Sequence, residues 1–193
     1  MESLICEPGP RNPLIFLSLS IINRVNDYKP NQKETINQLE CMHDLISKVS
    51  ATVFQIESVK TAVAVAVDAL LSVSSAEAKK ATEIRISALE CLLLLVEKLE
   101  ACGINCFVDI IPGILSKTLK IITSRVEVEI EKIILLALSI QLRAIECFWI
   151  EQDHWSEDNA LFKAKYRSNL DLAICSLRPL IKSERRAHFD HIL

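Results

Sequence analysis

Aromatic residues, glycine and proline are all scarce in this 193-residue chain. Only 5% of the residues are aromatic, and just three glycines and six prolines are present. An all-β fold needs frequent turns rich in glycine and proline, so the scarcity of these two residues excludes that class. Half of the residues are nevertheless hydrophobic, mainly Leu, Ile, Val and Ala. This composition predicts an all-α protein built from long helices.

The chain also lacks a strong net charge and a long uninterrupted apolar run. Its formal net charge is −3, from 22 basic and 25 acidic residues, so its overall charge lacks the excess of basic residues typical of nucleic-acid-binding proteins. A transmembrane helix needs about 18 consecutive apolar residues. Charged residues such as Glu90, Glu97 and Arg143 interrupt the most apolar stretches. We therefore expect neither a nucleic-acid nor a membrane partner.

The seven cysteines are too scattered for a disulfide framework. An odd number within apolar stretches is typical of reduced thiols in the cytoplasm or nucleus, and we expect the protein to be cytoplasmic and also nuclear. Cys41, Cys91 and Cys147 should be unpaired and slow to alkylate, because each lies within a predicted helix. Cys102 and Cys106 flank a turn, but no second pair with the spacing of a zinc finger follows. We expect no metal and no cofactor.

A short phrase occurs three times along the chain. It reads Leu39-Glu40-Cys41, then Leu89-Glu90-Cys91, then Ile145-Glu146-Cys147, so the copies are 50 and 56 residues apart. Each copy lies in a long amphipathic stretch. Repetition at this scale is the signature of helical-repeat arrays. In such arrays, helix pairs stack into a solenoid with an extended surface for protein partners.

The helices can be placed from their apolar periodicity. We predict a HEAT-type α-solenoid of stacked antiparallel helix hairpins, about three and a half pairs in all. Residues 1–12 should be a flexible lead-in, and residues 13–193 a single domain that stops within its last repeat. The predicted helices are Pro13–Val25, Gln32–Val49, Gln55–Val73, Ala81–Ala101, Ile104–Thr123, Val126–Ile150, one from Ser156 to Leu177, and the start of another at Ser183–Leu193.

Several side chains have specific expectations within these helices. Leu92, Leu95 and Ile111 should be almost completely buried between adjacent helix pairs. Pro112 should bend the helix that contains it, because proline removes a backbone donor. Gly103 should cap the helix before it, and His43, on an apolar stripe, should lie at the edge of the core.

Two patterns carry a family resemblance. Ile84–Leu92 has the aliphatic-Arg-x-x-Ala-x-x-x-Leu form of the second helix of a HEAT repeat, and Phe107–Leu115 resembles a first helix with a central proline. Together with Pro13–Val49 and the helix from Ile133, they make the chain similar to one family over most of Pro13–Leu193. That family is Tel2-interacting protein one, the largest subunit of the Triple T (TTT) cochaperone complex.

The resemblance implies a non-enzymatic scaffold. TTT works with the Hsp90 machinery in the maturation and stability of PI3-kinase-related kinases such as mTOR, ATM, ATR and DNA-PK. It implies the other TTT subunits, these kinases and Hsp90-associated proteins as partners. One alternative is a HEAT- or armadillo-like scaffold in transport or cytoskeletal regulation. Another is a small helical enzyme or ligand-binding bundle.

No catalytic signature supports the enzyme alternative. The sequence contains no nucleophile elbow, P-loop or dinucleotide fingerprint, so we expect neither a catalytic site nor a small-molecule substrate. Candidate residues for partner binding are instead an aromatic in an acidic loop and the one concentrated basic patch. These residues are Trp155, Arg178, Lys182, Arg185 and Arg186.

Overall fold

The computed structural model describes residues 5–26, 31–75, 82–103, 110–123 and 131–150. All regular structure in these ranges is helical, and they contain no strand. The predicted all-α class is therefore confirmed for the described part of the chain. Its elements are η1 (Gly9–Arg11), α2 (Pro13–Val25), α3 (Gln32–Lys48), η2 (Ala51–Gln55), α4 (Glu57–Ser74), α5 (Thr82–Cys102), α6 (Ile111–Thr123) and α7 (Glu131–Ile150).

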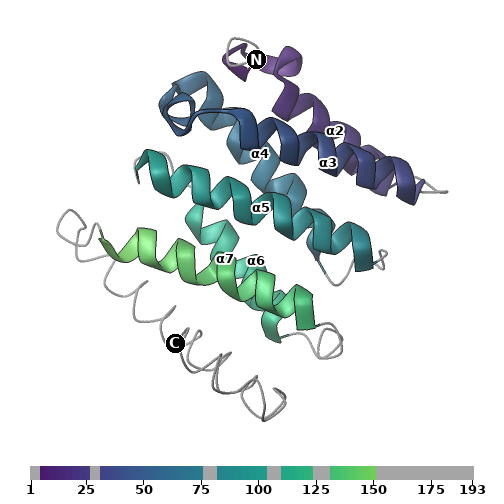
Figure 1. Ribbon diagram of the computed structural model, residues 1–193, viewed down its shortest axis with the longest axis vertical. Coiled ribbons are helices and arrows are strands. Elements are labelled where there is room, and N and C mark those ends of the chain that lie inside the picture. The colour runs from purple at the N-terminus through teal and green to yellow at the C-terminus, as the bar shows by residue number, and fades with distance from the viewer. Residues whose placement is uncertain (1–4, 27–30, 76–81, 104–109, 124–130, 151–193) are drawn as a thin grey trace.

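The six α-helices form two layers (Figure 1). Helix α4 contacts α2 on one side and α6 on the other, which makes the first layer. Helix α5 likewise contacts α3 and α7, which makes the second layer. Consecutive helices pair across the layers, because α2 packs on α3, α4 on α5 and α6 on α7. None of the described helices combines the length and apolar character that a membrane-spanning helix requires.

The helix ends follow from local sequence chemistry. Asn12 precedes α2 as its N-cap, where its side-chain oxygen accepts a hydrogen bond from the Leu14 amide at 2.9 Å. Asn31 does the same for α3 by accepting from the Glu34 amide at 3.3 Å. Both caps satisfy a backbone donor that has no partner within the helix. Gly103 has a φ of +93° directly after α5, which confirms the predicted C-terminal cap, since this left-handed conformation favours glycine.

The first turn of α6 corrects one prediction. We expected a helix over Ile104–Thr123 that Pro112 bends midway. Residues 104–109 lie outside the described part, but Ile110 is in a turn and α6 begins at Ile111. Pro112 is thus in the first turn of the helix. Its missing amide removes no helical hydrogen bond there, because the first amides of a helix have no intrahelical acceptor.

The N-terminal residues also differ from the expected flexible lead-in. Residues 1–4 lie outside the described part, whereas the Ile5 side chain is fully buried in the core. The fully buried Asn12 side chain donates to the carbonyls of Ile5 and Glu7. The Ser58 hydroxyl in α4 donates to the Cys6 carbonyl at 3.0 Å. These hydrogen bonds hold residues 5–12 against the start of α2 and α4.

Helix α5 is central to the core. It contacts α3, α4, α7 and the 3-10 helix η2. Leu92 and Leu95 of this helix and Ile111 of α6 are all 0% exposed, which confirms the predicted burial. The two apolar faces expected for this helix are also present, with Ile84 and Leu99 buried on one face and Leu89 and Val96 on the other. Two buried faces are what a helix with partners on both sides requires.

Candidate interaction surfaces

All the candidate binding residues predicted from the sequence lie outside the described part of the chain. The structure therefore neither brings them together nor separates them, and their role in partner binding stays a prediction. The same holds for the predicted helix to Leu177 and for the incomplete last repeat. These candidate residues are Trp155, Arg178, Lys182, Arg185 and Arg186. The surfaces that the structure describes belong to α2 through α7.

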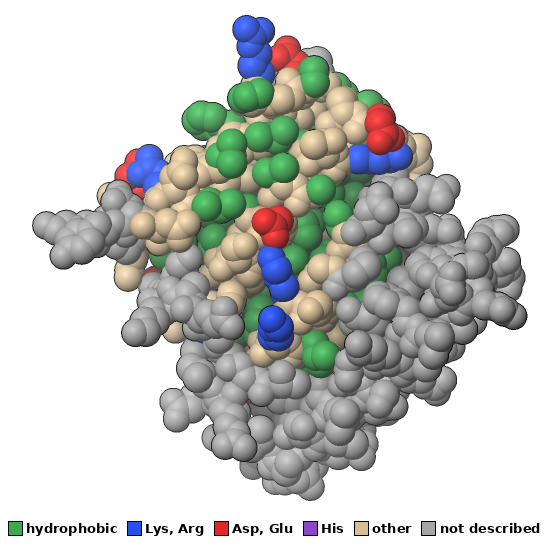
Figure 2. Space-filling model, turned by 180° about the vertical axis from the view of Figure 1, so that it is seen from behind, with side chains coloured by type: hydrophobic (Ala, Val, Ile, Leu, Met, Phe, Trp, Pro, Cys, Tyr) green, Lys and Arg blue, Asp and Glu red, His purple; other side chains and the backbone are tan. Residues whose placement is uncertain are grey.

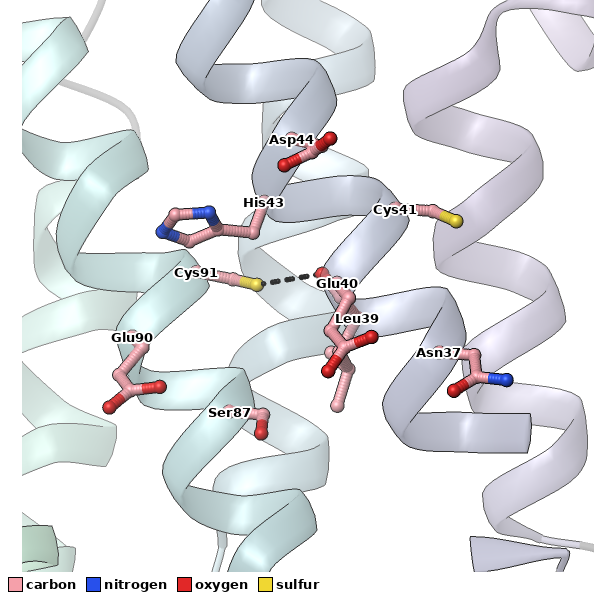
Figure 3. A pocket seen from close by; sticks show the side chains of 9 residues that line it. All are labelled: Asn37, Leu39, Glu40, Cys41, His43, Asp44, Ser87, Glu90 and Cys91. Atoms are coloured by element: carbon pink, nitrogen blue, oxygen red, sulfur yellow. Dashed lines mark hydrogen bonds between the residues drawn. The ribbon is translucent and has the colours of Figure 1, made fainter. Parts of the chain in front are cut away.

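An open hollow of about 720 Å³ lies between α3 and α5 (Figure 3). Residues of the first two copies of the repeated phrase line it from opposite sides, with Leu39–Cys41 on α3 and Glu90 and Cys91 on α5. The Cys91 thiol donates a hydrogen bond to the Leu39 carbonyl at 3.2 Å, which links the two helices. Both polar and apolar surface lines the hollow, from Asn37, Leu39, Glu40, Cys41, His43, Asp44, Ser87, Glu90 and Cys91.

The two cysteines in this hollow have opposite environments. Cys91 is buried, as predicted, and is not in a disulfide. Burial, with a smaller contribution from the nearby Glu90 carboxylate, raises the pKa of Cys91 to about 12. The thiol therefore stays protonated near neutral pH and is a poor nucleophile. Cys41 is exposed, so the expectation that it would be shielded is wrong. The side chain of Cys147 lies outside the described part.

His43 also corrects a prediction. The sequence placed it at the edge of the core, but its side chain is exposed and faces the hollow (Figure 3). The buried stripe of α3 runs instead through Leu39, Met42, Ile46 and Val49. Met42 and His43 lie three and four positions after Leu39, and both spacings place a residue on the same face of a helix. Spacing alone therefore did not show that Met42 faces inward. Leu39, Ile46 and Val49 belong to the predicted stripe as well, so the error is confined to the position that Met42 takes in place of His43.

Asp44 and Glu90, two of the three carboxylates that line the hollow, have cationic partners. The Asp44 carboxylate contacts the Lys48 ammonium at 2.9 Å, and this hydrogen bond and charge lower the pKa of Asp44. Glu90 contacts Lys132 of α7 at 2.7 Å. No group of three or more metal-ligating side chains gathers anywhere in the described residues. With a protonated Cys91 thiol and with Asp44 and Glu90 in ion pairs, the hollow has the features of a packing seam between helices.

Charged side chains of the second layer connect its helices to one another. The Lys98 ammonium of α5 donates to the Ser47 and Val49 carbonyls at the end of α3, at 3.0 and 2.9 Å. These hydrogen bonds give partners to carbonyls that have no acceptor role within the helix, because the last carbonyls of a helix lack intrahelical donors. The Arg143 guanidinium of α7 contacts Glu97 and Glu100 of α5, at 3.0 and 2.8 Å. Helices α3, α5 and α7 are therefore joined by polar contacts as well as by apolar packing.

The third copy of the repeated phrase is out of register with the other two. Cys91 contacts Leu39, 52 positions earlier, close to the spacing of 50 between the first two copies. In contrast, Lys132 contacts Glu90, 42 positions earlier, and Arg143 contacts Glu97, 46 positions earlier. These offsets fall about ten or more residues short of 56, which is roughly 15–20 Å along a helix. Sequence similarity at Ile145–Cys147 therefore does not mark a structurally equivalent site.

The first layer presents a different kind of surface (Figure 2). Its outward side chains are mostly apolar, small or uncharged, and Phe16 and Leu19 of α2 are 63% and 48% exposed. We call this surface the first-layer face. It is formed by Phe16, Leu19 and Asn23 of α2, by Thr61, Val65, Asp68 and Ser72 of α4, and by Ser116 and Lys120 of α6.

A comparison with protein families identifies the chain. Residues 16–169, about four fifths of the sequence, match the model of the TTI1 N-terminal TPR domain. No curated protein and no solved structure matches the chain. The family's domain is described as TPR, whereas the sequence patterns indicated HEAT, and both are repeats of stacked helix pairs. The chain therefore belongs to the TTI1 (Tel2-interacting protein one) family, through the N-terminal helical domain of that family.

Proposed function

We propose that the protein is a scaffold subunit of a TTT-like cochaperone complex, which supports the maturation and stability of PI3-kinase-related kinases together with the Hsp90 machinery. The match to the TTI1 N-terminal domain over residues 16–169 carries this proposal. The helical-repeat family is a scaffold family, and its members act through protein–protein contacts. The partners proposed here are the other TTT subunits, the kinases and Hsp90-associated proteins, encountered in the cytoplasm and the nucleus.

The architecture supports a scaffold role. Three consecutive helix pairs, α2/α3, α4/α5 and α6/α7, stack in chain order. Each pair packs against the next through contacts between helices of the same layer. We interpret this arrangement as a short α-solenoid, whose two open faces offer more surface than a closed bundle of the same length. The predicted fourth, half-complete pair would continue the array beyond α7. The described hollow lacks an activated nucleophile, which favours binding over catalysis.

Co-purification from cells tests the proposal. The tagged full chain should recover the other TTT subunits and PI3-kinase-related kinases, each identified by immunoblot. Leu92→Asp places a charge at a fully buried position of α5, so it should abolish recovery by unfolding the array. Lys33→Glu changes an exposed side chain of α3 and should leave recovery intact. Recovery of transport or cytoskeletal proteins without any TTT subunit would contradict the proposal and favour the alternative scaffold role.

A further inference from the structure

The two layers differ sharply in how they use charged residues. Helices α3, α5 and α7 each carry between four and six charged side chains. Helices α2, α4 and α6 together carry only Arg24, Glu57, Lys60, Asp68, Lys117 and Lys120. A solvated helix face is normally rich in charge, whereas the centres of protein interfaces are depleted of it. The first-layer face therefore has the composition of an interface.

Most of these few charges are already neutralised. Glu57 contacts Lys60 at 2.8 Å, and Asp68 contacts Lys117 at 2.7 Å. Arg24 contacts Glu34 of α3 at 2.6 Å. Within the described parts of α2, α4 and α6, Lys120 is the one charged side chain without an ion-pair partner. The charged group of this face that is available to a partner is therefore the Lys120 ammonium, which is positive.

The apolar part of the face lies along neighbouring helices. Phe16 and Leu19 are three positions apart and form a ridge on α2. Thr61 and Val65, four positions apart, form a lower ridge on α4, which packs directly against α2. A helix that crosses these ridges can place its side chains between theirs. Helix α6, which packs on the far side of α4, carries Lys120 in the same layer. The opposite side of the same layer is covered by helices, namely α3, α5 and α7 (Figure 1).

From these observations we propose that the first-layer face binds an amphipathic helix of a partner protein, with apolar anchors over Phe16 and Leu19 and a carboxylate that pairs with Lys120. The inference rests on the proposed scaffold function and names the surface and the kind of segment it binds. Charge complementarity selects the partner chemistry, since the face offers apolar ridges and one available cation. Helix-in-groove recognition of this kind uses anchors at spacings of three and four residues.

Two synthetic helical peptides test this proposal against the purified full chain. Both carry the same leucine stripe, and one has glutamates and the other lysines on the flanks of that stripe. Fluorescence anisotropy should show saturable binding of the glutamate peptide and at least about tenfold weaker binding of the lysine peptide. The double variant Phe16→Ser/Leu19→Ser should weaken the glutamate peptide by at least about tenfold. Lys120→Glu should reverse the preference between the two peptides.

Leu135→Ser is the matched control. Leu135 is 38% exposed but belongs to α7 in the second layer, so its loss should leave peptide binding unchanged. Circular dichroism checks that each variant keeps its helical content. Equal binding of the two peptides, or an equal loss with Leu135→Ser, would overturn the proposal. A homodimer that Phe16→Ser/Leu19→Ser dissociates would also overturn it, because the occupant would be a second copy. These assays use purified protein and synthetic peptides. Their failure would contradict the proposed surface only, whereas the scaffold function is tested separately by the recovery of TTT subunits from cells.

Discussion

Truncation of Leu92 to alanine should strongly destabilise the whole array. The Leu92 side chain is 0% exposed and lies in α5, which contacts α3, α4, α7 and η2. Leu92→Ala removes three carbon atoms from this core. Their transfer to water accounts for about 2–2.5 kcal/mol, and the cavity left among four neighbouring elements adds to that cost. We therefore expect a loss of about 3–5 kcal/mol in the free energy of unfolding, within the range for buried leucines.

Urea titration followed by circular dichroism at the helical band measures this loss. The same truncation at Leu135, which is 38% exposed in α7, deletes identical atoms and should cost less than about 1 kcal/mol. Both variants should unfold in one transition with an unchanged denaturant slope, because α5 is packed against both neighbouring helix pairs. A loss below about 0.5 kcal/mol at Leu92, or equal losses at the two sites, would refute the assignment of Leu92 to the core.

Other contacts give further predictions. In the native protein, iodoacetamide should label the exposed Cys41 quickly and Cys91 only as fast as the array opens, and mass spectrometry of digested protein distinguishes the two thiols. Burial raises the pKa of Cys91 from 9.0 to about 12, so the folded state retains a proton that the unfolded state releases. Stability should therefore fall as the pH rises from about 9 towards 12, and more steeply than in Cys91→Ala when both are titrated with urea. Asn12→Asp keeps the cap acceptor for α2 but loses the donor to the Ile5 and Glu7 carbonyls, so it should still lose about 1–3 kcal/mol in thermal or urea unfolding. Arg143→Ala removes two half-exposed ion pairs to α5 and should cost at most about 1 kcal/mol, a loss that shrinks in high salt.

The sequence predicted helices well where periodicity and capping residues agreed. Helix α2 has the predicted bounds Pro13–Val25, since Asn12 and Pro13 are strong signals for a helix start. Helix α5 was predicted to within one residue at each end, because its two apolar faces and Gly103 left little choice. Long, strongly periodic helices are the elements that sequence reasoning recovers best.

The errors have specific physical causes. Pro112 is compatible both with a bend within a helix and with the first turn of one, and local sequence does not distinguish the two. The 3-10 helix η2 at Ala51–Gln55 has no periodicity of its own, yet it buries Phe54 completely. The segment that buries Ile5 is held by a hydrogen bond from Asn12 to the Ile5 carbonyl and by one from Ser58 to the Cys6 carbonyl, and composition cannot show such contacts.

The candidate surface could be predicted only in part, for a similar reason. Concentrated charge and an aromatic in an acidic loop predict binding residues only beyond position 150. These signals did not single out Phe16, because an apolar residue in a short apolar helix normally suggests burial. The signal was nevertheless present in the spacing. Leu14, Ser18, Ile21 and Val25 already complete one buried face of α2, so Phe16 had to point elsewhere.

The different use of charge in the two layers fits a division of labour between cohesion and binding. In the second layer, Lys98 of α5 donates to a carbonyl at the end of α3, and Lys132 and Arg143 of α7 form ion pairs with α5. These contacts hold neighbouring helices in register. In the first layer, neighbouring helices pack with few charges, and the outward ridges carry Phe16 and Leu19 instead. Phe16, at 63% exposed, leaves most of its ring surface outside the core. Its presence on a charge-poor face is better explained by contact with another protein, as the proposed scaffold role requires.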